Sequence, residues 1–299
     1  MTRDLVGYGA NPPYANWPGG ARVAVQFVIN YEEGGENSIL HGDKGSEAFL
    51  SEMIGAQSQM GARAMAMESL YEYGSRAGFW RLKRLFDEFA MPVTVFGVAS
   101  AMEQNPAAVE AMLESGWEVA SHGYRWIDYQ SVPEEIEREH IAKAIEIHKR
   151  LTGERPLGWY QGRTSPNTAR LVVEEGGFTY DADSYADDLP FYDTRFAKPQ
   201  LIVPYTLDAN DMKFVALNGF TTGEQFQRYL IDAFEALHAE GETSPKMMSV
   251  GLHCRIVSKP GRILGLRRFL EHISSRQGVW VARRIDIARH WLVHHPFRP

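Results

Sequence analysis

The fold is decided by the stretch Val23-Ala24-Val25-Gln26-Phe27-Val28-Ile29-Asn30-Tyr31-Glu32-Glu33-Gly34. Its first part is rich in β-branched and aromatic residues with apolar side chains on both faces, which is typical of a strand buried on both sides. The strand then runs directly into Glu32 and Glu33. Carboxylates are costly to bury, so a partner or a chemical use is expected for them. The alternative is that they simply mark where the strand reaches water.

Strand and helix patterns alternate along the rest of the chain, at spacings suited to βαβ units. This predicts the α/β class and a single, distorted (β/α) barrel. We expect one catalytic domain over residues 1–299, with an irregular arm at 1–20, an insert at 34–77 that holds a helix over Met53–Met67, and the barrel over about 21–292. Strands are expected at 22–30, 92–96, 117–121, 157–161, 178–180, 201–204, 247–252 and 279–281, with helices between them.

Composition excludes several classes of protein. Of the 299 residues 44% are hydrophobic and 23% are charged, an ordinary globular balance. The net charge of −7, without a long basic run, argues against nucleic-acid binding. A single cysteine, Cys254, leaves no intrachain disulfide and fits a reducing compartment. The N-terminus lacks an apolar signal segment, and no stretch has the length of a membrane span. We therefore expect a cytoplasmic protein without a membrane partner.

Residues able to do chemistry follow five separate strands directly. In an α/β barrel the carboxyl ends of the strands share one face, so residues distant in sequence converge there. Their types suit general acid–base chemistry with charge partners that tune it. Taken singly, a strand-end histidine is more often structural, an arginine can lie at the surface and an aspartate can cap a turn. The shared position favours function for Glu32-Glu33, His122, Arg163, Asp181 with Asp183, and His253.

Two other chemistries receive little support. Cys254 stands beside His253, but neighbours on a strand point to opposite faces, so a thiol nucleophile would lack its base. No glycine-rich phosphate loop is present in the sequence, which argues against a nucleotide-dependent reaction.

The ordered motifs resemble those of the polysaccharide deacetylase (NodB-like) family. The resemblance covers roughly residues 22–291 and implies a distorted barrel that hydrolyses an amide, usually the N-acetyl group of a sugar. That family uses an aspartate base, followed by an aspartate that binds a divalent metal with two histidines of an H-x-x-x-H segment. The matching segments are Tyr31-Glu32-Glu33-Gly34, Ser121-His122-Gly123-Tyr124-Arg125-Trp126, Tyr160-Gln161-Gly162-Arg163, Tyr180-Asp181-Ala182-Asp183-Ser184-Tyr185 and Leu252-His253.

This sequence departs from the family pattern at the metal site. The aspartate pair is replaced by Glu32-Glu33, and Trp126 stands at the position of the second histidine. Tryptophan cannot be a metal ligand because its ring nitrogen is only a donor, and catalytic zinc normally has three protein ligands. We therefore expect no metal and no other cofactor, although His41 or another residue remains a possible third ligand.

Within the family these changes resemble the cofactor-independent allantoinases of bacterial purine degradation, and Glu32-Glu33-Gly34-Gly35-Glu36 is part of the match. The resemblance implies hydrolytic opening of (S)-allantoin to allantoate by a homo-oligomer such as a tetramer. A small, neutral, hydrogen-bond-rich ring suits a pocket of charged and aromatic side chains.

The roles implied by the motifs are as follows. One of Glu32 and Glu33 is the base, and Arg163 orients that carboxylate. His253 gives a proton to the leaving nitrogen, held by Asp183 or Asp181 in the manner of a triad. The expected substrate contacts are His122, Trp126, Glu36, Tyr160 and Asp181.

Three other functions stay open at this point. They are a metal-dependent de-N-acetylase of a sugar or peptidoglycan fragment, a hydrolase of another cyclic amide, and a catalytically inactive barrel that only binds a ligand. The intact acid–base residues count against the last of these.

Overall fold

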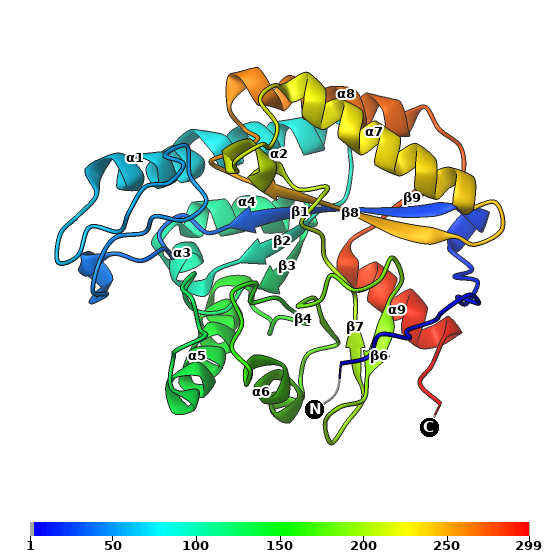
Figure 1. Cartoon of the computed structure of the whole chain (residues 1–299), viewed down its shortest axis with the longest axis horizontal. Helices are drawn as coiled ribbons and strands as arrows, with labels where there is room; N and C mark the ends of the chain where they lie inside the picture. The colour runs from blue at the N-terminus through cyan, green and yellow to red at the C-terminus, as the bar shows by residue number, and fades with distance from the viewer. Residues whose placement is uncertain (1–2, 299) are drawn as a thin grey trace.

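Strand β1 (Val23–Tyr31) lies second from one end of a curled, open sheet, described for residues 3–298 by a computed structural model (Figure 1). The strand order is β6-β7-β5-β4-β3-β2-β1-β8, and β9 also pairs with β1. The β6–β7 pair is antiparallel and the other pairs are parallel. The α/β class and the distorted barrel are thus confirmed. The other strands are β2 Thr94–Gly97, β3 Glu118–Ser121, β4 Gly158–Trp159, β5 Tyr180–Asp181, β6 Phe191–Asp193, β7 Gln200–Ile202, β8 Lys246–His253 and β9 Val279–Val281.

The register of β1 with its neighbours brings three strand ends to one level. Asn30 is paired with His253 of β8, and Tyr31 is paired with Gly97 of β2. Gly97 in turn is paired with Ser121, the last residue of β3. The residues that follow β1 and β3 therefore lie beside the end of β8.

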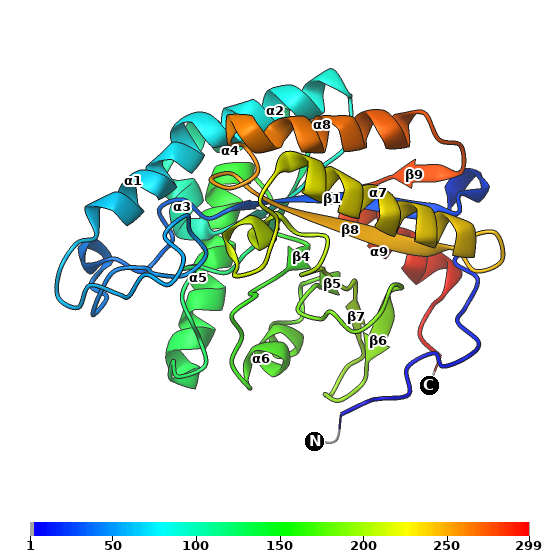
Figure 2. The same cartoon turned by 45° about the horizontal axis from the view of Figure 1, so that its top comes forward.

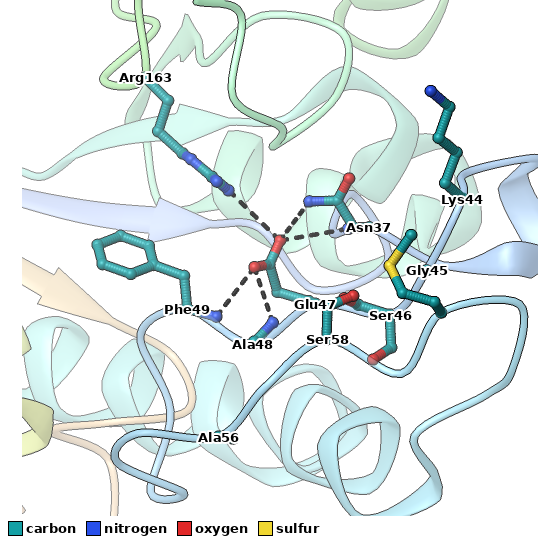
Figure 3. Close-up of a pocket in the computed structure, with 11 residues that line it drawn as sticks. Asn37, Lys44, Gly45, Ser46, Glu47, Ala48, Phe49, Ala56, Ser58 and Arg163 are labelled. Carbon is teal, nitrogen blue, oxygen red and sulfur yellow. Dashed lines mark hydrogen bonds and ion pairs between the residues drawn. The ribbon is translucent and has the colours of Figure 1, made fainter.

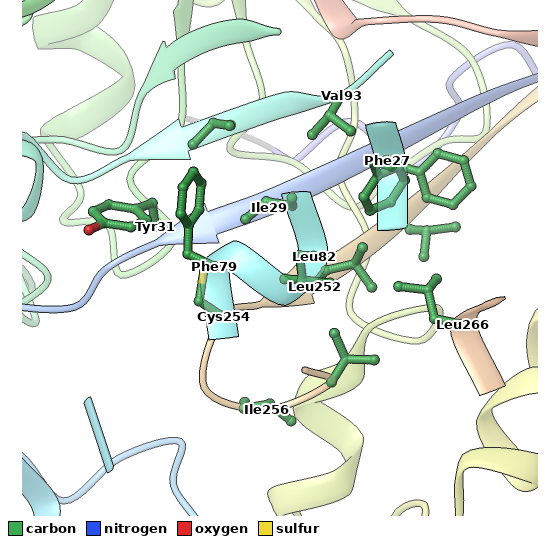
Figure 4. Close-up of a cluster of buried hydrophobic side chains, with 14 of the residues drawn as sticks. Phe27, Ile29, Tyr31, Phe79, Leu82, Val93, Leu252, Cys254, Ile256 and Leu266 are labelled. Carbon is green, nitrogen blue, oxygen red and sulfur yellow. The ribbon is translucent and has the colours of Figure 1, made fainter. Parts of the chain in front are cut away.

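Side chains of β1 alternate between two buried layers, so that all nine residues of the strand are buried. Phe27, Ile29 and Tyr31 pack against the helices together with Phe79 of α2 (Figure 4). Ala24 and Val28 belong to a second cluster on the inner face of the sheet. This alternation predicts that Glu32 continues the inner face and that Glu33 continues the outer one.

The same alternation separates Cys254 from His253 on β8. Cys254 is fully buried in the outer cluster, where its thiol lies 3.8 Å from the Asn30 carbonyl oxygen (Figure 4). The expectation that the two neighbours face different layers is confirmed.

Helices cover both faces of the sheet, and α7 and α8 pack side by side above β1 and β8 (Figures 1 and 2). Thr222 and Gln225 form a capping box at the start of α7. The helices are α1 Met65–Tyr73, α2 Phe79–Glu88, α3 Ala99–Gln104, α4 Pro106–Glu114, α5 Glu134–Thr152, α6 Thr168–Glu175, α7 Gly223–Glu240, α8 Pro260–Ser274 and α9 Arg284–His294.

The prediction of a helix over Met53–Met67 is wrong. Gly55 and Gly61 adopt positive φ angles of 79° and 67°, and Met60 is 67% exposed in an irregular loop. Helix α1 begins only at Met65 and continues through a π-helical turn, Gly74–Gly78, into α2. Met53 and Met60 of this loop are exposed and do not pack between helices.

Across residues 3–298, every helix is too short or too polar to cross a membrane. The expected arm at 1–20 and the domain at 1–299 include residues 1, 2 and 299, which lie outside the described part.

Candidate active site

Three side chains from separate strand ends meet at the carboxyl edge of the sheet. Glu32 follows β1, His122 follows β3, and His253 is the last residue of β8. The Glu32 Oε1 atom lies 3.4 Å from His122 Nε2 and 3.5 Å from His253 Nε2. None of the three is more than 5% exposed. A buried carboxylate is thus held between two imidazoles.

A fourth residue of this group, Arg255, was not predicted from the sequence. Its Nη1 atom donates to Glu32 Oε2 at 2.7 Å and lies 3.5 Å from Glu33 Oε1. Arg255 is only 2% exposed. The signal in the sequence was its position two residues after His253, in the turn that follows β8.

A fifth residue, Asp211, orients His253. Its Oδ1 atom lies 2.6 Å from His253 Nδ1, and its Oδ2 atom accepts from the backbone N–H of His253 at 2.7 Å. A β-bridge between Asn210 and Gly251 brings this segment to the edge of β8. The position beside His253 that was expected for Asp183 or Asp181 is therefore occupied by Asp211. We call Glu32, His122, His253, Arg255 and Asp211 the acid–base cluster.

The cluster drives the pKa values of its base and its acid apart. Burial would raise the pKa of Glu32, but the charges of Arg255 and His253 hold it well below its usual range. Burial would lower the pKa of His253, but Asp211 and Glu32 raise it to about 9. At neutral pH the site therefore holds an ionised Glu32 beside a protonated His253. Such a separation is the pattern of a general base and a general acid.

Glu33 lies on the other side of Arg255 and faces the helices. A Cβ atom on Gly74 would lie 2.3 Å from Glu33 Oε1, so only glycine fits at this π-helical turn. Burial raises the pKa of Glu33 to about 7, opposed by Arg255 and supported by Glu32. Glu33 thus contacts Arg255 from the outer face of the sheet. The inner-facing Glu32 is therefore the candidate base.

The close approach of Gly74 to Glu33 yields a test of this packing. We expect Gly74→Ala to destabilise the fold by about 1–3 kcal/mol, because the added methyl group must displace a buried carboxyl group. The matched control is Gly261→Ala on α8, where an added Cβ meets nothing within 4 Å and a helical alanine is favourable. Urea unfolding of both variants measures the difference; equal stability of the two would show that Glu33 does not pack on this turn.

Trp126 forms a wall between the cluster and an adjoining cavity. Its ring centre lies 5.2 Å from the guanidinium carbon of Arg255 and 5.1 Å from that of Arg163. Phe49 stacks on the same ring at 6.0 Å. Arg163 and Phe49 in turn line a cavity of about 500 Å³ (Figure 3). Trp126 therefore lies between Arg255 of the cluster and the two residues, Arg163 and Phe49, that line the cavity.

Arg163 does not orient the catalytic carboxylate, contrary to the expectation from its motif. It pairs with Glu47 of the insert at 3.3 Å, and Arg255 takes the place beside Glu32. Glu47 also accepts hydrogen bonds from the backbone of Ala48 and Phe49, each at 2.9 Å (Figure 3). Arg163 thus fixes the loop that carries Phe49.

The remaining expected residues surround the cluster. Tyr160 packs against His122 with ring centres 4.8 Å apart, which fits a pocket position. Glu36 accepts from the backbone N–H of Gly34 at 2.7 Å and is bound to its own loop. Asp183 accepts from the backbone of Gln161 and Gly162, and Asp181 accepts from the backbone of Asp183. The aspartates thus hold the β4 and β5 loops.

The residues present do not fit the divalent metal of the polysaccharide deacetylases. Trp126, without a ligand atom, stands where a second histidine is needed. Arg255 places a fixed positive charge between Glu32 and Glu33, where it would repel a cation. His41, the possible substitute, lies 3.1 Å from Arg125 Nη2. In the described part of the chain, no group of three or more His, Cys, Asp or Glu is arranged to hold a metal.

Comparisons with known proteins place this site in a family. The polysaccharide deacetylase family matches residues 63–180. A Schizosaccharomyces pombe protein, named only provisionally as a polysaccharide deacetylase, is 44% identical over 99% of each chain. A Pseudomonas aeruginosa structure with a similarly provisional name is 59% identical, with a TM-score of 0.98 over 100% of each chain. A structure of Puue allantoinase is 58% identical, with a TM-score of 0.98 over 100% of this chain and 99% of that one. The chain belongs to the polysaccharide deacetylase family.

Proposed function

We propose that the protein is an allantoinase, which opens the hydantoin ring of (S)-allantoin to allantoate by general acid–base catalysis without a metal. Membership of the family makes the chain a hydrolase; the substrate and the mechanism are what is proposed. The observation that carries the proposal is the full-length likeness to Puue allantoinase. The side chains around Glu32 support the metal-free mechanism. Arg255 and Trp126 lie there, and neither can be a metal ligand.

The acid–base cluster supplies each proton transfer that ring opening needs. Glu32 takes a proton from water, and the water oxygen bonds to the ring carbonyl carbon while the C=O electron pair moves to oxygen. When the carbonyl re-forms, the C–N bond breaks and the leaving nitrogen takes a proton from the His253 imidazolium. Asp211 stabilises that imidazolium and fixes its tautomer. His122 and Trp126 position the flat ring.

A substrate comparison tests this assignment. Purified protein is given allantoin, another hydantoin, a dihydropyrimidine and N-acetylated glucosamine oligomers, and allantoate, the other ring-opened products and acetate are measured. We expect allantoin to have the highest kcat/KM. Release of acetate as the main activity would favour a de-N-acetylase and contradict the proposal, and preference for another ring would reassign the substrate.

The charge state of His253 predicts the alkaline limit of activity. The pKa is raised from 6.5 to about 9, so the protonated acid is present at neutral pH and is lost as the pH rises through about 9. By linkage, the stability that the protonated His253 contributes is complete below pH 6.5. It decreases above that pH and is lost as the pH rises through about 9. We expect kcat/KM and the urea midpoint to fall together toward pH 9. A kcat/KM that rises through this range would contradict a protonated His253.

The homo-oligomer expected from the sequence stays a prediction. Light scattering on the purified protein measures the mass of the assembly directly, and a mass of one chain, 33.8 kDa, would contradict it.

A further inference from the structure

Two neighbouring side chains, one of the acid–base cluster and one next to it, carry a buried hydrogen-bond donor that has no partner in the described part of the chain. They are the second terminal nitrogen of Arg255, Nη2, and the hydroxyl group of Tyr71 on α1. Arg255 is 2% exposed and Tyr71 is 1% exposed. Buried donors are almost always paired, because an unpaired one costs folding free energy. Two such donors on neighbouring side chains are therefore available to a ligand atom.

The two side chains lie against each other at the candidate site. The guanidinium carbon of Arg255 is 4.2 Å from the centre of the Tyr71 ring. Both side chains contact Trp126, whose ring centre is 6.2 Å from that of Tyr71. Arg255 uses its other nitrogens on Glu32 and on the carbonyl oxygen of Leu50. Its Nη2 atom is thus held rigidly while it remains free to donate.

The Tyr71 hydroxyl stays a neutral donor throughout the working pH range. Burial raises its pKa well above the usual value, and the carboxylates of Glu47 and Glu32 add to this effect against the opposing charge of Arg255. A phenol kept protonated in a dry site can donate to developing negative charge.

We propose that Arg255 Nη2 and the Tyr71 hydroxyl form the oxyanion site of this enzyme. They donate to the carbonyl oxygen when water adds and the C=O electron pair moves onto that oxygen. This inference rests on the proposed hydrolysis of a ring amide, which needs such a site when no metal polarises the carbonyl. It gives Tyr71, a residue of the insert and of no strand-end motif, a catalytic role.

Tyr71→Phe is the sharpest test, because it removes one hydroxyl and keeps the ring beside Arg255. We expect kcat for allantoin to fall by about 10²-fold to 10³-fold with little change in KM, since the lost donor acts mainly in the transition state. We also expect the melting temperature to rise by about 2 °C or more, because an unpaired buried hydroxyl is removed. Loss of activity together with a gain in stability is not what a structural hydroxyl produces.

Tyr73→Phe, on the same helix, is the matched control. The Tyr73 hydroxyl accepts a hydrogen bond from Arg81 Nη1 at 2.6 Å, and the ring packs under Lys259. Its removal is expected to lower the melting temperature and to leave kcat unchanged, the reverse of the Tyr71 result.

The outcomes separate this inference from the proposed function. A wild-type kcat in Tyr71→Phe, or a rise in KM alone, would overturn the oxyanion role while allantoin hydrolysis stands. If the wild-type protein does not open allantoin, the proposed substrate is wrong. The melting temperatures still show whether the Tyr71 hydroxyl is unpaired or hydrogen-bonded. A lower melting temperature for Tyr71→Phe would show a structural hydrogen bond and overturn the inference.

Discussion

Glu32→Gln is expected to lower kcat for allantoin by about 10³-fold or more, because the substitution removes the inner-facing base of the cluster. Glutamine keeps the volume of the side chain and cannot take a proton from water. The substitution also affects the general acid His253, because Glu32 is one of the two charges that raise the pKa of His253 to about 9. The alkaline limit of the residual activity is therefore expected to move to lower pH.

A buried charge left without its partner can also destabilise the fold, so the Glu32 variant needs a control. Glu118→Gln makes the same change at a half-buried, hydrogen-bonded carboxyl group at the start of β3, at the opposite end of the strand from His122. We expect this control to keep wild-type kcat per folded molecule, with folding of both variants checked by melting. Near-wild-type kcat in folded Glu32→Gln would remove Glu32 from the mechanism.

Asp211→Asn is expected to lower kcat by about 10³-fold to 10⁴-fold. An asparagine amide can turn its N–H₂ group toward His253 Nδ1, which favours the wrong tautomer and removes the charge that stabilises the imidazolium. The backbone N–H groups of His253 and Val257 both donate to Asp211 Oδ2, and an amide oxygen can still accept from them. We therefore expect the backbone hydrogen bonds of His253 and Val257 to be kept while His253 loses its function as a general acid.

Asp183→Asn is the natural comparison, because the sequence motif gave this residue the role that the structure gives to Asp211. Asp183 accepts from the backbone of Gln161 and Gly162 and has no hydrogen bond to His253 among the described contacts. We expect a smaller loss of kcat and an unchanged alkaline limit near pH 9. If Asp183→Asn moves that limit and Asp211→Asn does not, the Asp211–His253 pair is not the working one.

The sequence predicted the parts of the molecule that follow from local pattern. The apolar run at the start of the chain identified strand β1, and the position of Glu32, His122 and His253 at strand ends predicted that they converge. Parallel strands end at one edge of a sheet, so this convergence follows from topology alone. Alternation along a strand also separated Cys254 from His253 correctly.

The local sequence pattern could not predict which side chains pair with these residues. Asp211 belongs to an irregular segment, and only the bridge between Asn210 and Gly251 brings it to His253. The family motif assigned Arg163 to the candidate base, but Glu47 of the insert is its ion-pair partner in the structure. Such pairings depend on how loops cross the strand ends, which neither propensity nor periodicity encodes. Tyr71 was missed for the same reason, since nothing in a helical tyrosine marks it for a site.

The central claim is that this member of the family hydrolyses a ring amide with Arg255 and the acid–base cluster in place of a metal. The most direct test is the rate of allantoin opening by purified protein after exhaustive chelation, with metal content measured on the same sample and zinc then added back. The account predicts full turnover in the metal-free protein and no gain from zinc. Activity that disappears on chelation and returns with zinc would contradict it.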